Sequence, residues 1–106
     1  MSNLLPDMGS QDDKDDAGLI RELTIANRLG IHARPAALFV KTASRFRSDV
    51  FVEKDGERIN GKSIMGLMML AAGPGCRLRV EVNGADAPDA LAAIEELVCR
   101  RKFDED

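Results

Sequence analysis

The stretch RLRVEV, residues 77–82, is the most regular alternation of polar and apolar residues in the chain. Side chains of a β-strand point alternately to the two faces of its sheet, so this pattern predicts a strand with one buried face. Leu78, Val80 and Val82 form that face. The tripeptide Gly-Pro-Gly before the stretch and the dipeptide Asn-Gly after it are typical of turns and set the limits of the strand.

Three shorter alternations predict the other strands of the same sheet. Residues 20–26 indicate a strand with Leu23 and Ile25 facing inward. Residues 50–53 and 58–60 indicate two more strands, and the Asp-Gly pair between them favours a tight hairpin turn.

Apolar residues recur at helical spacing in three segments, which predicts three helices. The first begins between Ala33 and Pro35 and runs to about Arg47, and the second is capped by Ser63 and runs to about Ala72. The third opens at an Asp-Ala-Pro-Asp stretch. The residues expected to face the core are Ala36, Phe39, Val40, Ala43 and Phe46 in the first helix, and Leu91, Ile94, Leu97 and Val98 in the third.

The order of elements is strand, helix, strand, strand, helix, strand, helix. This split β-α-β pattern predicts an α+β fold, in which three helices cover one face of a four-stranded antiparallel sheet. Residues 19–102 form this single domain. Residues 1–18 hold five aspartates and one lysine, a net charge of −4, so we expect a flexible acidic tail. An inert extension is favoured there over a partner-binding segment. Residues 103–106 are expected to fray.

Composition excludes several classes of function. The formal net charge is −3, so the residues after the tail carry a net +1, and there is no Trp or Tyr. Such a domain lacks the basic face and stacking platform of a typical nucleic-acid-binding protein. No apolar run approaches the ~20 residues that cross a bilayer, and no secretory signal is present. Isolated Cys76 and Cys99, a single histidine and the lack of a nucleotide-binding motif indicate a cytoplasmic protein with free thiols, without metal or cofactor.

The stretch NRLGIHARPAA, residues 27–37, contains the only histidine, His32. Gly30 turns the chain before it, and the first predicted helix begins directly after it. A helix start offers unpaired backbone N–H groups and the positive end of the helix dipole, which stabilise a phosphate. Imidazole is a competent nucleophile near neutral pH. His32 is therefore either the carrier of a phosphoryl group or a partly exposed polar residue at a helix cap.

Two motifs resemble the HPr family, the histidine-containing phosphocarriers of the bacterial sugar phosphotransferase system. GIHARPA, residues 30–36, is similar to the phosphorylation motif of that family, and NGKSIMGLMML, residues 60–70, is similar to its regulatory-serine segment. The resemblance extends over about residues 19–100. It implies an open-faced β-sandwich, a phosphoryl group on Nδ1 of His32, and assistance from Arg34, whose guanidinium can hold phosphoryl oxygens in a bidentate manner.

The resemblance also implies partners. Enzyme I would phosphorylate His32 at the expense of phosphoenolpyruvate, and His32 would pass the group to an EIIA-type acceptor. The chain would be a phosphotransferase-system component rather than a stand-alone catalyst, and we expect a monomer. Met69 and Ala71-Ala72 differ from the best-known sugar-transport versions and are more similar to the nitrogen-related or regulatory branches, which leaves the pathway open.

Ser63 has two interpretations. As a preferred N-cap it stabilises the second helix, typically by about 0.5–2 kcal/mol. The resemblance adds regulation, because residues 62–67 match the site that a dedicated HPr kinase/phosphorylase modifies in part of the family. A phosphate there would add charge to a docking surface. If this were the main role, the chain would be a regulatory binding protein, acting on a transcription factor or an enzyme, rather than a phosphate relay. An unrelated small ligand-binding domain would explain the periodicities but not two motifs in register.

The second predicted helix is apolar nearly all round, and a short helix on a single layer cannot bury every side. The side that carries Leu67 is expected to face the core. Ile64, Met65 and Met68 are candidates for an exposed patch that docks partners, because such patches mark interaction sites and methionine surfaces accept several partners. Core packing of these side chains is the alternative.

Overall fold

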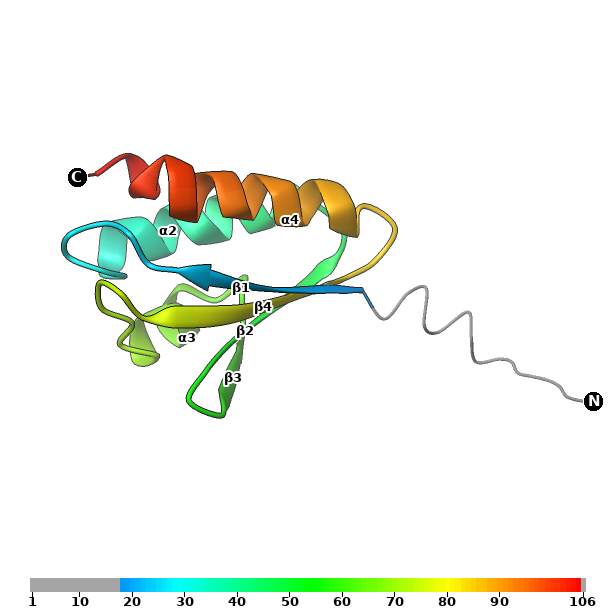
Figure 1. Ribbon diagram of the computed structural model, residues 1–106. Helices are drawn as coiled ribbons and strands as arrows, with labels where there is room; N and C mark the ends of the chain where they lie inside the picture. The colour runs from blue at the N-terminus through cyan, green and yellow to red at the C-terminus, as the bar shows by residue number, and fades with distance from the viewer. Residues whose placement is uncertain (1–17, 106) are drawn as a thin grey trace, which may run out of the picture.

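The computed structural model describes residues 18–105, so the acidic tail predicted at 1–18 lies outside the described residues except for Gly18. The described part of the chain folds in the predicted order (Figure 1). The elements are β1 (Leu19–Thr24), α2 (Ala33–Ala43), β2 (Asp49–Lys54), β3 (Glu57–Asn60), α3 (Ile64–Met69), β4 (Arg77–Asn83) and α4 (Ala87–Glu95), followed by a π-helical turn, η1 (Glu96–Arg100), and a 3-10 turn, η2 (Lys102–Asp104).

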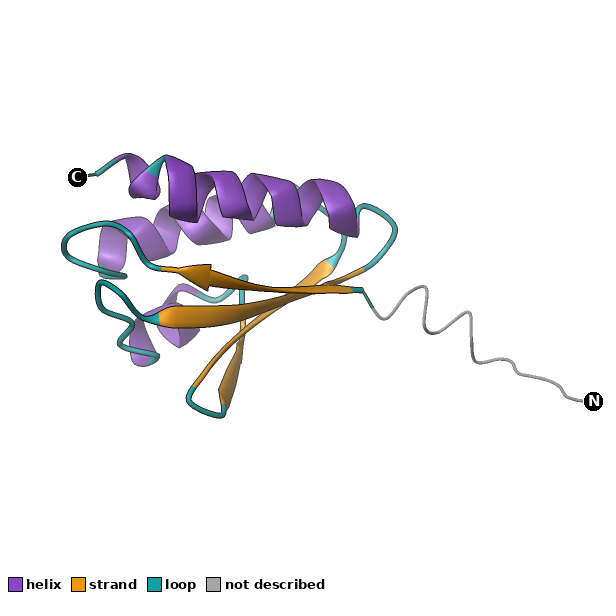
Figure 2. Ribbon diagram, viewed as in Figure 1, coloured by secondary structure: helices purple, strands orange, loops and turns teal. Residues whose placement is uncertain are grey.

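The four strands form one antiparallel sheet in the spatial order β1-β4-β2-β3 (Figure 2). β4 lies inside the sheet, between β1 and β2. The alternation that defined this strand in the sequence is realised, because Leu78, Val80 and Val82 are each 0% exposed. β4 therefore supplies the middle of the core.

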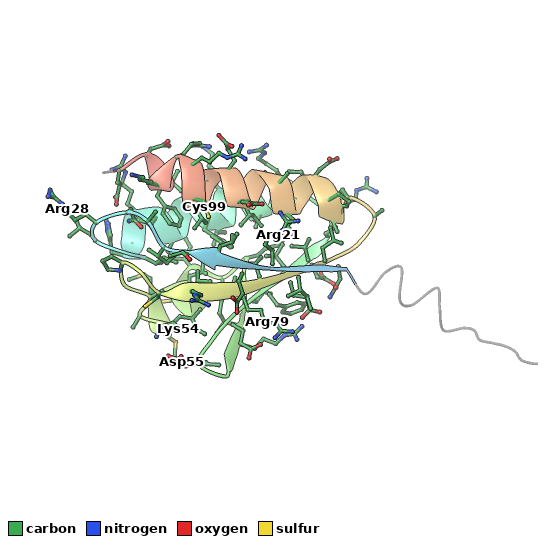
Figure 3. All side chains as sticks on the ribbon, in the orientation of Figure 1. Arg21, Arg28, Lys54, Asp55, Arg79 and Cys99 are labelled. Atoms are coloured by element: carbon green, nitrogen blue, oxygen red, sulfur yellow. The ribbon has the colours of Figure 1, made fainter. Side chains whose placement is uncertain are left out.

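Two helices, α2 and α4, lie side by side over the buried face of the sheet (Figure 1). The apolar stripes predicted for them enter the core, and α3 packs against α2 and β3. The opposite face of the sheet carries charged side chains, among them Arg79 (Figure 3) and an ion pair between Arg58 and Glu81 at 3.1 Å. This is the predicted open-faced α+β sandwich. No helix within residues 18–105 combines the length and the apolar character that a bilayer crossing requires.

Two helices are shorter than predicted. α2 ends at Ala43, because turn bonds take over after it, from the Arg45 N–H to the Thr42 carbonyl and from the Phe46 N–H to the Ala43 carbonyl, both 3.2 Å. α3 ends at Met69, and Ala71 then adopts a positive φ of 53°. These differences leave the predicted order of elements unchanged.

The prediction that residues 103–106 fray is wrong for the described part of that segment. Phe103 is 0% exposed and belongs to the hydrophobic core. Lys102, Phe103 and Asp104 all have positive φ, between 51° and 60°, and this left-handed turn carries the chain back toward the start of α2. Arg101 holds the turn through two hydrogen bonds to the Asp104 carboxylate, at 2.7 and 3.0 Å. The end of the chain is thus packed rather than loose.

Replacing Phe103 by alanine tests this anchoring. Removing a fully buried phenyl ring typically lowers the free energy of unfolding by about 3–5 kcal/mol. We expect F103A to lose about 3 kcal/mol in urea or thermal unfolding. Phe51, half-buried on the open face of the sheet, is the matched control, and F51A is expected to lose about 1 kcal/mol. Equal losses in the two variants would show that the C-terminal turn is not part of the core.

Candidate functional site

His32 lies at the end of a tight loop that connects β1 to α2. The Gly30 N–H donates to the Asn27 carbonyl (3.3 Å), and the Asn27 side-chain amide donates to the Gly30 carbonyl (2.8 Å). Gly30 has a φ of 71°, and a Cβ atom there would lie 2.5 Å from the carbonyl oxygen of Ala72. Only glycine meets both the backbone angle and the close approach. Arg28 projects outward from this loop (Figure 3).

The loop is bonded to the segment that follows α3. The Ile31 N–H donates to the Ala72 carbonyl at 2.8 Å, and the Ile31 side chain is buried. The residue directly before His32 is therefore fixed both by its backbone and by its side chain. The same contact brings the start of α2 and the end of α3 to one end of the molecule (Figure 1).

His32 is the N-cap of α2, at the start that the sequence predicted. Its backbone is extended, its carbonyl accepts from the Ala36 N–H at 3.0 Å, and its imidazole makes no capping bond. Ala33 and Arg34 are the first helical residues, so their N–H groups have no intrahelical acceptor, whereas Pro35 has no N–H to offer. The imidazole is 42% exposed. A half-exposed imidazole thus lies beside two backbone N–H groups that have no intrahelical acceptor.

A carboxylate from the far end of the chain lies against this ring. Nε2 of His32 is 3.3 and 3.2 Å from the two oxygens of Glu105, and Nη1 of Arg34 is 3.7 Å from one of them. The buried Asn27 amide donates to the same carboxylate at 3.0 Å. This Asn27 hydrogen bond, aided by His32 and Arg34 and opposed by desolvation, holds the pKa of Glu105 below its ordinary value of 4.5. At neutral pH the Glu105 side chain therefore only accepts hydrogen bonds.

Glu105 and the second role of Asn27 were missed in the sequence. In the sequence, Asn27 is indistinguishable from an ordinary turn residue. Glu105 lies in a run of charged residues that is typical of a loose terminus. The one available signal was Phe103, a large apolar residue among charged neighbours, which indicates an anchored end. The contact itself joins residues 73 positions apart, and no local pattern encodes it.

Ser63 is the N-cap of α3, and its hydroxyl accepts a hydrogen bond from the Gly66 N–H at 3.0 Å. It is half-buried. The structural interpretation of this residue, as a helix cap, is therefore realised in full. Its regulatory role stays a prediction.

The candidate docking residues are exposed side chains of α3. Ile64 and Met68 are each 41% exposed and Met65 is 69% exposed, while Leu67 on the opposite side is fully buried. Met69, which was not named as a docking residue, is exposed as well. We call Ile64, Met65, Met68 and Met69 the α3 patch. It lies at the same end of the molecule as the start of α2 (Figure 1).

Within residues 18–105, no three His, Cys, Asp or Glu side chains are grouped so that they could hold a metal ion, and Cys76 and Cys99 are free thiols.

A family model described as "PTS HPr component phosphorylation site" matches residues 19–100. The chain belongs to the HPr family. The Phosphocarrier protein HPr of Neisseria meningitidis is 49% identical over 80 residues, which cover 76% of this chain and 90% of the relative. The HPr-like protein Crh of Bacillus subtilis is 46% identical over 78 residues, covering 74% and 92%.

Solved structures of the HPr family agree with the fold. The crystal structure of HPr-C-His from Thermoanaerobacter tengcongensis has a TM-score of 0.79 and 43% identity, and the match covers 83% of this chain and 98% of that one. A structure described as an HPr dimer from the same organism has a TM-score of 0.64 and 44% identity, covering 76% and 92%. Dimers therefore occur among the relatives.

Replacing Ser63 by alanine tests the cap. Loss of the hydroxyl leaves the Gly66 N–H without its acceptor, and we expect the free energy of unfolding to fall by about 1 kcal/mol. Ser44→Ala is the control, because Ser44 is an exposed residue at the C-terminal end of α2, and we expect it to change stability by less than about 0.5 kcal/mol. If S63A were as stable as S44A, the hydroxyl would not be acting as a cap.

Proposed function

We propose that the chain is a phosphocarrier. His32 accepts a phosphoryl group from phospho-enzyme I, which obtains it from phosphoenolpyruvate, and passes it to an EIIA-type acceptor. The observation that carries this proposal is the half-exposed imidazole at the start of α2, beside Arg34, in a chain of the HPr family. The partner proteins supply the donor and the acceptor, so the chain is a component of the phosphotransferase system and not a catalyst by itself.

Transfer begins when a ring nitrogen of His32 attacks the phosphorus of the donor. Phosphoryl transfer needs little covalent chemistry from a protein and mainly requires positioning and charge stabilisation. The N–H groups of Ala33 and Arg34 and the positive end of the α2 dipole face the incoming charge. A dipole contributes only about 0.3–1 kcal/mol at an exposed helix end, so the bound group is held moderately and can be given away.

Arg34 supplies the mobile positive charge. Its side chain is 65% exposed and lies 3.7 Å from Glu105, a long contact at an exposed position. A guanidinium held so loosely is free to turn toward phosphoryl oxygens, which it can grip in a bidentate manner. We therefore assign Arg34 to stabilisation of the transferred group.

The α3 patch is proposed as the docking surface for both partners. It is apolar, exposed and rich in methionine, and it lies at the same end of the molecule as His32. A partner that covers the patch would hold its own phosphorylated group near the imidazole. We propose that the chain acts in the cytoplasm, as a monomer.

A second candidate function is a regulatory binding protein that an HPr kinase/phosphorylase controls by phosphorylating Ser63. The similarity to Crh, a protein also described as a catabolite repression HPr, favours it. A phosphate on Ser63 would stand at the start of α3, directly beside Ile64 of the patch, and would place charge where partners dock. The His32 and Arg34 pair favours the carrier as the primary function.

Labelling with enzyme I and phosphoenolpyruvate tests the carrier function. We expect an acid-labile, alkali-stable phosphate in the wild type and in S63A, and none in H32A. Because the chain contains a single histidine, phosphohistidine can form only at His32. ATP-dependent labelling that S63A removes, with no labelling of His32 by any cognate enzyme I, would favour the regulatory function instead.

Substitution of Arg34 tests charge stabilisation. Loss of one charge-assisted contact to an exposed phosphoryl group corresponds to about a tenfold lower rate, so R34A is expected to accept phosphate about tenfold more slowly. The rate of R34K is expected to lie between those of R34A and the wild type, because lysine keeps the positive charge but cannot hold two phosphoryl oxygens in a bidentate manner. R45A, at an exposed arginine beyond the end of α2, is the control and should match the wild type. Wild-type rates in R34A would remove Arg34 from the site.

A further inference from the structure

Every methionine within residues 18–105 lies in the α3 patch: Met65, Met68 and Met69. The buried side chains of the hydrophobic core are those of Leu, Ile, Val, Ala and Phe, with no methionine among them. We propose that these three methionines form a redox modification site, where oxidation by a peroxide to the sulfoxide makes the patch polar and weakens the docking of enzyme I. This regulation rests on the proposed function, in which the patch is the docking surface.

The sulfur atoms of the patch are accessible in the folded chain. Met65 and Met69 are 69% and 67% exposed, and Met68 is 41% exposed. An oxidant must contact the sulfur, so these positions can react without unfolding of the protein. Leu67 and Leu70, through which α3 packs against the core, are buried and carry no oxidisable group. Oxidation therefore changes the outer surface of α3 and leaves its packing in place.

The reaction is a transfer of one oxygen atom from hydrogen peroxide. A lone pair of the thioether sulfur attacks one peroxide oxygen, the S–O bond forms, and the O–O bond breaks. The proton on the transferred oxygen goes to the departing hydroxide, which leaves as water. The sulfur is oxidised by two electrons and the peroxide is reduced. Peptide methionine sulfoxide reductases return the sulfoxide to the thioether at the expense of a thiol, so the modification is reversible.

A sulfoxide changes what the patch can bind. Its oxygen is a hydrogen-bond acceptor, and burying it against an apolar partner surface without a donor is unfavourable. Interfaces rich in methionine lose their apolar character in this way. The patch lies at the same end of the molecule as His32 (Figure 1), but its sulfur atoms take no part in the transfer itself. Oxidation is therefore expected to weaken docking and to leave the chemistry at the imidazole intact.

Two thiols are the other oxidisable sulfur groups in the part of the chain that the structure describes. Cys76 and Cys99 are half-buried, and neither belongs to the α3 patch. Burial raises the pKa of the Cys99 thiol, which favours the protonated form at neutral pH. Because the thiolate is the reactive form, this protonation protects Cys99. The experiment must still separate the methionines from the thiols.

A map of oxidation tests the site itself. The folded full-length chain is treated with hydrogen peroxide, and peptide mass spectrometry locates each sulfoxide. We expect Met65 and Met69 to be converted first and Met68 more slowly, with a thermal unfolding curve close to that of the untreated chain. Faster conversion of Met68 than of the other two, or loss of the folded state as they are converted, would overturn the site. This measurement needs no partner protein.

The kinetics of phosphate uptake from phospho-enzyme I test the consequence. We expect the KM for the oxidised chain to rise about tenfold with kcat unchanged, and treatment with the reductases to restore it. The matched control is the triple variant M65L/M68L/M69L, because leucine keeps the apolar character but forms no sulfoxide. This variant retains Met8 and both thiols. Its KM, whatever the value before treatment, is expected not to respond to peroxide.

Two kinetic results would overturn the regulation. They are an unchanged KM in the oxidised wild type, and an equal rise of KM in the triple variant, which would assign the effect to Met8 or to the thiols. An untreated chain that no enzyme I phosphorylates would contradict the proposed function instead. The oxidation map then decides the modification site by itself.

Discussion

The backbone of the His32 loop lies directly against the backbone that follows α3, and the site depends on this contact. Gly30 permits the approach, because any Cβ there would meet the Ala72 carbonyl, and the Ile31–Ala72 hydrogen bond closes it. The contact sets where α2 begins, and hence where the imidazole and the first unpaired N–H groups stand. It also carries the α3 patch to the same end of the molecule. One backbone contact thus joins the proposed nucleophile, His32, to its proposed docking surface.

Much of the fold could be predicted because it is local. The alternation in residues 77–82 gave a buried strand, the helical spacing gave three helices, and Ser63 gave a cap that the structure realises. The start of α2 at His32 followed from the glycine before it and the proline after it. These features depend on neighbours within a few positions, which is the range over which sequence patterns are informative.

The C-terminal turn could not be predicted in the same way, because its stability depends on opposing free-energy contributions of similar size. Left-handed backbone is unfavourable by about 1–2 kcal/mol per residue, and three successive residues adopt it. Burial of Phe103 returns about 1.5–3 kcal/mol, and the exposed Arg101–Asp104 ion pair contributes little more. Local propensity alone therefore favours fraying. The contacts of Glu105 with Asn27 and His32 come from distant sequence, and they complete the balance.

The central claim is that His32 carries a phosphoryl group at the start of α2, on the nitrogen that faces away from Glu105. The most direct measurement is the one-bond ¹⁵N–³¹P coupling in the ¹⁵N-labelled chain after incubation with enzyme I and phosphoenolpyruvate. The account predicts a single coupled imidazole nitrogen, Nδ1 of His32. A coupling to Nε2, or a phosphorus signal from a serine ester with no coupled nitrogen, would contradict it.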